Sequence, residues 1–587
     1  MRAHRWTIVA ALSVLAVYGV CLSVLPTHVF WMPDEGAKYL ELHSVHWTRP
    51  HYDVAFPAQR IDPRFEFLPD PEIFPPPVTA ANGSLYLGFQ TPVLFPLVSG
   101  VAWHWFGITG LYLLPLACGW GVAVVSGLLL ARLRPSWAPV AVLVVGLTTP
   151  VWFYSLVFWE HTVACFLALL AVYIATASPR WNLAAVLGAL VTLTAAVTLR
   201  MDIVPFSAAV FAGWALSSVV ARRHSGPHRL PARPPPSSRW ITYLLLAGLA
   251  VGLLLVFQHS LTLRHHNVVS SMPRRLGVAL SGLWNRPRSL VEILVHAPTI
   301  EAPRVSDTIA VGVAIALLVC GLAAGARSAR TEAALTLTGA SVVLGFSLFL
   351  LCTSQHYRSL HGLFPVAPFV CLWPCALRHG WRQRSHALLT LAHISLFGLA
   401  FGFLAIAGSY VWQGRLQVGM EWGQRYMLAL YPVLAVATLA GLLAGATTAR
   451  PRWLGRLLSV VALALLLVGG ALEIRGLRML NETRQQLAKW DQAMRTEGPI
   501  ITDIWWLPSA VAVLFTEHDM FFTGNRARVA RWVDLATAQG VDRFTFASFA
   551  PVTLPELHTP RLRHVGTRSV DGLTLTSFEI DSGDSHP

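Results

Sequence analysis

Carboxylates that have a basic side chain close by in the sequence are the first candidates for chemistry in this chain. They fall in three short segments: Asp34-Glu35 with Lys38, Glu160-His161, and Glu421 with Arg425. A carboxylate next to apolar surroundings has a raised pKa and becomes a stronger general base. Such a group could take the proton of an acceptor hydroxyl.

Cationic side chains near these segments could hold an anion. An arginine guanidinium donates two parallel hydrogen bonds to a phosphate, which makes arginine well suited to such a ligand. The candidates for substrate or phosphate binding are Arg425, Arg358, His356, His161, Arg200, Glu421 and Lys38. Together with the candidate catalytic residues Asp34, Glu35 and Glu160, they indicate a site that handles a phosphate. A metal ligand set cannot be identified from the sequence.

Each of these residues also has a purely structural interpretation. Arg200 could form a salt bridge with Asp202, and Glu160 could belong to a structural ion pair. Arg425 could be an anchor that extends its charged end to the membrane surface. His356, Arg358 and His361 could contact lipid headgroups. The functional interpretation depends on the whole set of residues. A purely structural interpretation would require a separate explanation for each of them, although all are predicted on the same face.

The composition defines the class of protein that these residues serve. Of 587 residues, 55% are apolar and 12% are charged, whereas a soluble domain carries about 25% charged residues. This excludes a soluble globular enzyme and favours a membrane protein with many spans. The formal charge is +15, which in this setting favours anionic lipid or lipid phosphate as the partner, and not nucleic acid.

The hydropathy pattern predicts about 13 transmembrane helices. A span needs about 20 predominantly apolar residues, and runs near that length lie at 7–25, 109–131, 137–154, 162–177, 182–199, 203–220, 241–258, 307–325, 333–352, 363–377, 386–407, 426–445 and 457–472. The shorter run 92–106 carries Trp103, His104 and Trp105, residues typical of the membrane interface. We therefore expect 92–106 to be an interfacial helix.

The distribution of Lys and Arg predicts a cytoplasmic N-terminus. With that orientation, the cytoplasmic segments hold 18 Lys and Arg in 61 residues, against 14 in 153 on the opposite side. The higher density agrees with the positive-inside rule. The candidate site residues then fall on the external face of the inner (plasma) membrane, where a lipidic anionic substrate would reach them.

The polar C-terminal part is predicted to be a separate domain. We expect a transmembrane domain over 1–472, with a long first external loop at 26–91, and an extracytoplasmic domain over 473–587. In the latter, helices are predicted at 473–496 and 526–538, and strands at 499–503, 543–548 and 573–579. The predicted fold class is an all-α polytopic membrane protein with a small α/β C-terminal domain.

The chain resembles the GT-C superfamily of integral-membrane glycosyltransferases, which includes protein O-mannosyltransferases and the lipid A aminoarabinose transferase. Trp31-Met-Pro-Asp34-Glu35, followed by Tyr39, is similar to the first-loop signature of that family. Tyr154-Ser155 to Glu160-His161 is similar to its second external acidic motif. The segment from Gly419 to Pro432, which contains Arg425-Tyr-Met-Leu, resembles a third element of bacterial members.

The resemblance implies a cell-envelope transferase that uses a polyprenyl-phosphate-linked sugar as donor and a glycan, lipid or protein as acceptor. It assigns the base to Asp34 with support from Glu35, the second acidic position to Glu160, and the lipid phosphate to Arg425 and Arg358. It leaves a divalent cation (Mg or Mn) open, and Glu160-His161 departs from the family members that have Asp-x-Asp-like metal motifs. Attack opposite the phosphate would invert the anomeric configuration.

Two other functions remain open at this point. One is a transporter or flippase of a lipid-linked saccharide, although such proteins usually show paired broken helices near the membrane midplane. The other is an O-antigen-ligase-like transferase with the same topology. The Asp34-Glu35 signature favours the glycosyltransferase.

Overall fold

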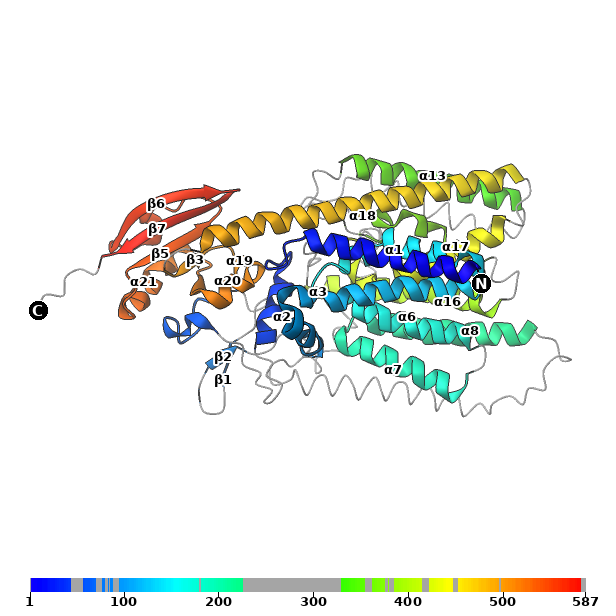
Figure 1. The fold of residues 1–587 in the computed structure, drawn as a ribbon, viewed down its shortest axis with the longest axis horizontal. Helices are drawn as coiled ribbons and strands as arrows, with labels where there is room; N and C mark the ends of the chain where they lie inside the picture. Colours follow the sequence, from blue (N-terminus) through cyan, green and yellow to red (C-terminus); the bar gives the residue numbers. More distant parts are fainter. Residues whose placement is uncertain are drawn as a thin grey trace, which may run out of the picture. The chain divides into compact units, whose positions relative to one another are not determined.

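The computed structural model is mostly helical, with a small mixed sheet near the C-terminus (Figure 1). The residues that the structure describes are 2–43, 56–69, 77–79, 83, 85–87, 94–178, 181–224, 329–353, 360, 362–374, 378, 385–413, 422–446, 452–495 and 498–581. Among them, five helices are long and apolar enough to cross a membrane. The chain is therefore treated as an integral membrane protein. The predicted spans 241–258 and 307–325 lie outside the described residues, and the number 13 stays a prediction.

The chain divides into two compact units. Unit 1 comprises Met1–Leu22 and Leu114–Arg478, and unit 2 comprises Ser23–Leu113 and Met479–Pro587. The segment 26–91, predicted to be the first external loop, thus belongs to the same unit as the C-terminal sheet. Three helices have parts in both units: α1 (Arg2–Val24), α3 (Leu94–Ala131) and α18 (Arg452–Met494).

Apolar helices form unit 1. They are α4 (Ala138–Leu147), α5 (Val151–Tyr154), α6 (His161–Ala177), α7 (Leu183–Leu199), α8 (Ile203–His224), α13 (Ala329–Thr353), α14 (Leu363–Val366), α16 (His386–Gln413) and α17 (Leu430–Ala446), with 3-10 turns η2 (Pro135–Trp137), η5 (Pro368–Leu372) and η6 (Arg425–Met427). Helices α6, α7 and α8 pack side by side, and α8 also packs on α16 (Figure 1). A buried hydrogen bond of 2.8 Å between Ser217 Oγ and His393 Nδ1 links α8 to α16.

Several predicted helices differ from those in the structure. The predicted span 137–154 is interrupted, because α4 ends at Leu147 and Pro150 precedes the short α5. The predicted span 363–377 contains only the short α14 and η5 within its described part. The separate helices predicted at 457–472 and 473–496 form one helix, α18. No residue in this stretch breaks the helical pattern, so the polar half continues the apolar half.

The break between the predicted interfacial helix and the following span is confirmed. Within α3, Gly107 has φ 59 and ψ −151, which separates 94–106 from 108–131. Trp105 in the first part is exposed. Whether 94–106 lies at a membrane interface stays a prediction.

Unit 2 contains a five-stranded mixed sheet with the order β4-β3-β5-β7-β6. The strands are β3 (Ile500–Thr502), β4 (Met520–Phe522), β5 (Arg543–Ser548), β6 (Leu562–Val570) and β7 (Leu573–Ile580). β3 is parallel to β4 and β5, whereas β7 is antiparallel to β5 and β6. The strands predicted at 499–503, 543–548 and 573–579 are confirmed, and β4 and β6 were not predicted.

Short helices connect the strands of this sheet. Helices α19 (Leu507–Ala510) and α20 (Ala512–Glu517) join β3 to β4, while η7 (Arg526–Arg528) and α21 (Val529–Ala538) join β4 to β5. The 3-10 turn η8 (Leu554–Leu557) precedes β6. The first loop adds α2 (Pro33–His43), η1 (Pro57–Arg60) and a hairpin of β1 (Pro77–Thr79) with β2 (Leu85–Leu87).

Helix α2 packs directly on the helices of the C-terminal domain. It contacts α19 and α20, and the Phe30 backbone N–H donates to the Ala510 carbonyl oxygen at 2.8 Å. Gly36 is required at the contact with α19, because a Cβ there would lie 1.7 Å from the Ser509 carbonyl oxygen. The segment that carries Asp34 is thus fixed to the C-terminal domain.

We predict that Gly36→Ala destabilises unit 2. The added methyl meets a backbone atom that cannot rotate away, and such overpacking costs roughly 1–3 kcal/mol. Thermal denaturation of the detergent-solubilised protein measures the effect. Gly19→Ala in α1 is the matched control, since a Cβ at Gly19 meets nothing within 4 Å. Equal melting temperatures for the two variants would contradict the packing described.

Candidate functional site

Arg200 is the centre of a charged cluster in unit 1. It follows α7 as the C-cap residue. Its Nη1 donates to Glu160 Oε1 at 2.8 Å and its Nε donates to Asp202 Oδ1 at 2.7 Å, and Nη1 also lies 3.3 Å from His161 Nδ1. Burial disfavours the charged guanidinium, but Asp202 and Glu160 outweigh burial and hold the pKa of Arg200 above its ordinary value. The cluster thus keeps a permanent cation in a mostly buried place.

Aromatic rings enclose this cluster. His161 stacks on Tyr154 with ring centroids 5.5 Å apart and lies 4.7 Å from the Trp159 ring centroid. Tyr154 and Trp159 also stack on each other. Tyr154 lies in α5, Trp159 in the loop before α6, and His161 is the first residue of α6; all three are buried. The low dielectric of such surroundings strengthens the interactions of any charge held there.

Arg425 joins the same cluster from η6. Its guanidinium carbon lies 5.1 Å from the Trp159 ring centroid and 4.9 Å from that of Tyr426, at cation–π distance. Its Nη2 donates to the Tyr426 hydroxyl at 2.9 Å. Arg200 lies 5.9 Å from the same Tyr426 ring. Two guanidinium groups therefore approach one tyrosine, and their mutual repulsion would be relieved by an anion.

The loop before Arg425 is held by backbone hydrogen bonds. The Trp422 N–H donates to the Tyr154 hydroxyl at 3.3 Å, and the Gln424 N–H donates to the Tyr431 hydroxyl at 3.0 Å. Gly423 has φ 70, a conformation that favours glycine. Its N–H donates to the Leu360 carbonyl oxygen at 2.6 Å. The segments around Tyr154 and Arg425, which are far apart in the sequence, are thus in direct contact.

Glu473 is a buried acid next to this loop that sequence reasoning missed. It lies in the apolar part of α18 and is fully buried, and neither carboxyl oxygen hydrogen-bonds to a described residue. Its polar neighbour is the indole of Trp422. Gly476, one turn later, makes room for that ring, because a Cβ there would lie 2.3 Å from Trp422 Cε2. The available signal was an acidic residue directly at the end of the apolar run 457–472.

In unit 2, Asp34 and Glu35 differ sharply in exposure. Both lie in the first turn of α2. Asp34 is partly exposed, whereas Glu35 is fully buried. Lys38, also buried, donates from Nζ to the Asp34 backbone oxygen at 3.4 Å. Asp34 is therefore the carboxylate of this pair that a substrate in solution could reach.

Glu35 forms a buried ion pair with Arg484, another residue that sequence reasoning missed. Arg484 Nη2 donates to Glu35 Oε2 at 3.2 Å, and both side chains are 0% exposed. Glu35 Oε1 also accepts from the Met32 N–H at 3.1 Å. The Arg484 guanidinium carbon lies 4.8 Å from the Tyr112 ring centroid. Glu35 thus connects α2 to α18, which gives it a role in positioning Asp34.

Three of the predicted site residues cannot be placed. His356, Arg358 and Glu421 lie outside the described residues. The structure brings together Glu160, His161, Arg200 and Arg425 in unit 1, and Asp34, Glu35 and Lys38 in unit 2.

The described acidic residues of unit 1 do not fit a divalent cation. Within the described part of the chain, no group of three or more His, Cys, Asp and Glu side chains could hold a metal ion. Glu160, Asp202 and His161 instead surround the Arg200 guanidinium. A positive group at that point would repel Mg²⁺ or Mn²⁺.

Comparison with known proteins gives similarity only at the level of structure. No family model and no curated protein matches the chain. The structure of ArnT from Cupriavidus metallidurans in the apo state is similar over 99% of both chains, with 13% identity and a TM-score of 0.48. Its structure bound to undecaprenyl phosphate covers 97% of this chain and 98% of that chain, with 14% identity and a TM-score of 0.38.

The archaeal oligosaccharyltransferase AglB from Archaeoglobus fulgidus, in complex with an inhibitory peptide and a dolichol-phosphate, is similar over 91% of this chain and 69% of that chain. The identity is 12% and the TM-score 0.40.

We predict that Glu473→Gln preserves stability whereas Glu473→Ala does not. Glu473 is fully buried and forms no ion pair within the described residues, so a neutral amide of the same shape should fit in its place. Gln keeps its shape and polarity, while Ala removes the neighbour of Trp422 at a cost of roughly 1–3 kcal/mol. Thermal denaturation measures both. A Gln variant as unstable as the Ala variant would show that the charge itself is needed.

We also predict strong coupling between Glu35 and Arg484. Glu35→Leu or Arg484→Met alone leaves a buried charge without its ion-pair partner, which costs roughly 3–5 kcal/mol. The double variant removes both charges and should lose much less stability than the sum of the single variants. A double-mutant cycle on melting temperature tests this. Additive losses would show that the pair contributes no coupling.

Proposed function

We propose that the chain is a membrane glycosyltransferase that takes a sugar from a polyprenyl-phosphate-linked donor and transfers it to an acceptor. The observation that carries this proposal is the buried cluster in which Arg200 and Arg425 approach the same Tyr426 ring. Paired guanidinium groups favour a phosphate, and their position in a protein with apolar spans favours a phosphate attached to lipid.

Arg425 is the proposed phosphate ligand and Arg200 supports it. Arg425 lies against Trp159 and Tyr426, so its guanidinium is weakly hydrated and its fork is oriented by the Tyr426 hydroxyl. Arg200 is already held by Glu160 and Asp202. Glu160 and His161 then act by orienting Arg200. Arg358 and His356 remain candidates for the same phosphate, and Glu421 remains a candidate for substrate binding.

Asp34 is the proposed general base. It removes the proton of the acceptor hydroxyl, and the acceptor oxygen attacks the anomeric carbon of the donor. The bond between that carbon and the phosphate oxygen breaks, and its electron pair stays on the departing lipid phosphate. Attack from the side opposite the phosphate inverts the anomeric configuration. Glu35 and Lys38 hold the first turn of α2 that carries Asp34.

The proposed topology places this reaction on the extracytoplasmic face. A cytoplasmic N-terminus and about 13 spans put the first loop and the C-terminal domain outside, as the Lys and Arg distribution indicates. The partners are a polyprenyl-phosphate sugar, membrane lipids and an acceptor glycan, lipid or protein. Labelling of single cysteines introduced at positions 34 and 230 should reach them from opposite sides of the membrane.

We predict that Asp34→Asn lowers sugar transfer by about two orders of magnitude or more, because general base catalysis typically contributes 10²–10⁴-fold. Binding of undecaprenyl phosphate should be unchanged. Arg425→Ala should instead weaken that binding, since it removes a charge-assisted phosphate contact. Transfer from a panel of polyprenyl-phosphate sugars, and lipid binding to purified protein, are the two measurements.

Arg132→Ala is the matched control for Arg425→Ala, because Arg132 also lies over a tyrosine ring, that of Tyr173, outside the cluster. It should change neither measurement. Wild-type transfer by Asp34→Asn would refute its role as base. Movement of an intact lipid-linked saccharide across vesicles without any transfer would instead identify a transporter.

A further inference from the structure

The C-terminal domain has the strand arrangement in which ligands bind at the carboxyl edge. The chain passes from the central β3 to β4 on one side and returns to β5 on the other side of β3. In open sheets with parallel strands, this reversal leaves a place for a ligand at the carboxyl ends of the strands. Asp503 follows β3, and Phe549 follows β5. The register pairs Thr502 with Ala547, so the segments that begin at 503 and 548 are adjacent.

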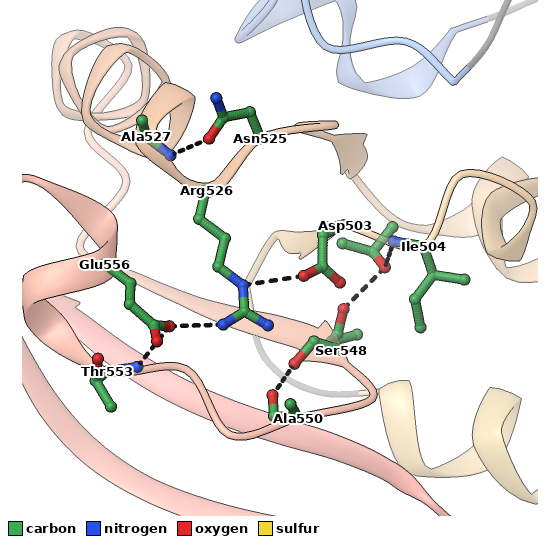
Figure 2. A network of polar contacts seen from close by, with 11 residues as sticks. Asp503, Ile504, Asn525, Arg526, Ala527, Ser548, Ala550, Thr553 and Glu556 are labelled. Atoms are coloured by element: carbon green, nitrogen blue, oxygen red, sulfur yellow. Dashed lines mark hydrogen bonds and ion pairs between the residues drawn. The ribbon is translucent and has the colours of Figure 1, made fainter.

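A polar network occupies this edge (Figure 2). Arg526 lies in η7, just after β4; its Nε donates to Asp503 Oδ2 at 3.0 Å and its Nη1 donates to Glu556 Oε2 at 2.6 Å. Glu556 also completes the capping box of η8 with Thr553. The three charged side chains are partly exposed, with 23–43% of each accessible. They offer both donors and acceptors to a polar ligand in fixed positions.

Aromatic rings lie at the same edge. Trp506 and Phe549 have ring centroids 6.3 Å apart, and both lie close to the buried Trp490. Phe549 is 55% exposed and the neighbouring Trp505 is 43% exposed. Phe549 begins the segment next to Asp503. Exposed aromatic rings that gather beside an ordered polar network are typical of a recognition site.

We propose that this edge, formed by Asp503, Arg526, Glu556, Trp506 and Phe549, binds a saccharide. A sugar ring has an apolar C–H face that can stack on an aromatic ring, and hydroxyl groups on its rim. Carboxylates accept hydrogen bonds from adjacent hydroxyls, and the guanidinium donates to them. An anionic lipid surface fits less well, because two of the three charged groups are carboxylates. A saccharide satisfies both the apolar and the polar parts of the edge.

The place of this edge within unit 2 indicates which role the bound saccharide has in the proposed reaction. Trp506 is the N-cap residue of α19, and α19 packs on α2, the helix that carries Asp34. The saccharide edge and the proposed base therefore belong to one compact unit. If the proposed function holds, the bound saccharide is the acceptor, or the glycan part of the acceptor.

Saccharide binding can be measured on the full-length protein in lipid nanodiscs without any donor. The probes are fluorescently labelled tetrasaccharides of mannose, glucose, arabinose and N-acetylglucosamine. At least one should bind, and Phe549→Ser and Asp503→Asn should each weaken its affinity roughly tenfold, the effect expected for an anchoring contact. Val565→Ser is the control, because Val565 is equally exposed but lies on β6.

The outcomes separate this inference from the proposed transferase activity. Val565→Ser should bind the saccharide like the wild type, because Val565 lies on β6 and has no part in transfer or in this edge. Absence of binding by all four probes would overturn the inference, as would binding that Phe549→Ser and Asp503→Asn leave unchanged. Binding of sugar-free vesicles with anionic lipid that is lost in Phe549→Ser would also overturn it, and would assign the edge to a membrane contact. None of these results depends on whether transfer occurs.

Discussion

The cost of burying charge is the constraint on which the candidate site depends. Arg200 is largely removed from water, and it stays charged because Glu160 and Asp202 both accept its hydrogen bonds at close to ideal distance. Without these carboxylates, nothing would offset the desolvation cost of the buried guanidinium, which is several kcal/mol. The aromatic rings of Tyr154, Trp159 and His161 exclude water around this arrangement. The result is a rigid cation beside Arg425, prepared before any ligand arrives.

The same constraint acts in unit 2 with a different outcome. Glu35 and Arg484 are both fully buried and form an ion pair with each other, so neither is accessible to a substrate. Asp34, the preceding residue of α2, is partly exposed. One carboxylate thus anchors the helix while its neighbour remains available for chemistry. The buried Glu35–Arg484 pair therefore keeps the exposed Asp34 carboxylate in position.

Helix α18 contributes to both units through residues of opposite character. In its apolar part, Glu473 lies beside Trp422 and supports the loop that ends at Arg425. In its polar part, Arg484 pairs with Glu35. A continuous helix lets one element carry both contacts. The sequence predicted two separate helices, 457–472 and 473–496, and so did not indicate that Glu473 and Arg484 lie on the same helix.

The sequence alone determined the membrane class, most helix positions and three of the five strands of the C-terminal sheet, because hydrophobic length and alternation are local properties. It also indicated Asp34, Glu160, Arg200 and Arg425 as a set, since charges are rare in this chain and cluster beside aromatic residues. Only the tertiary structure decided which of them meet. Glu160 contacts Arg200, 40 positions away in the sequence. Glu35 pairs with Arg484, 449 positions away, and Trp422 lies next to Glu473, 51 positions away. Such contacts arise from packing in three dimensions, and no local pattern in the chain specifies them.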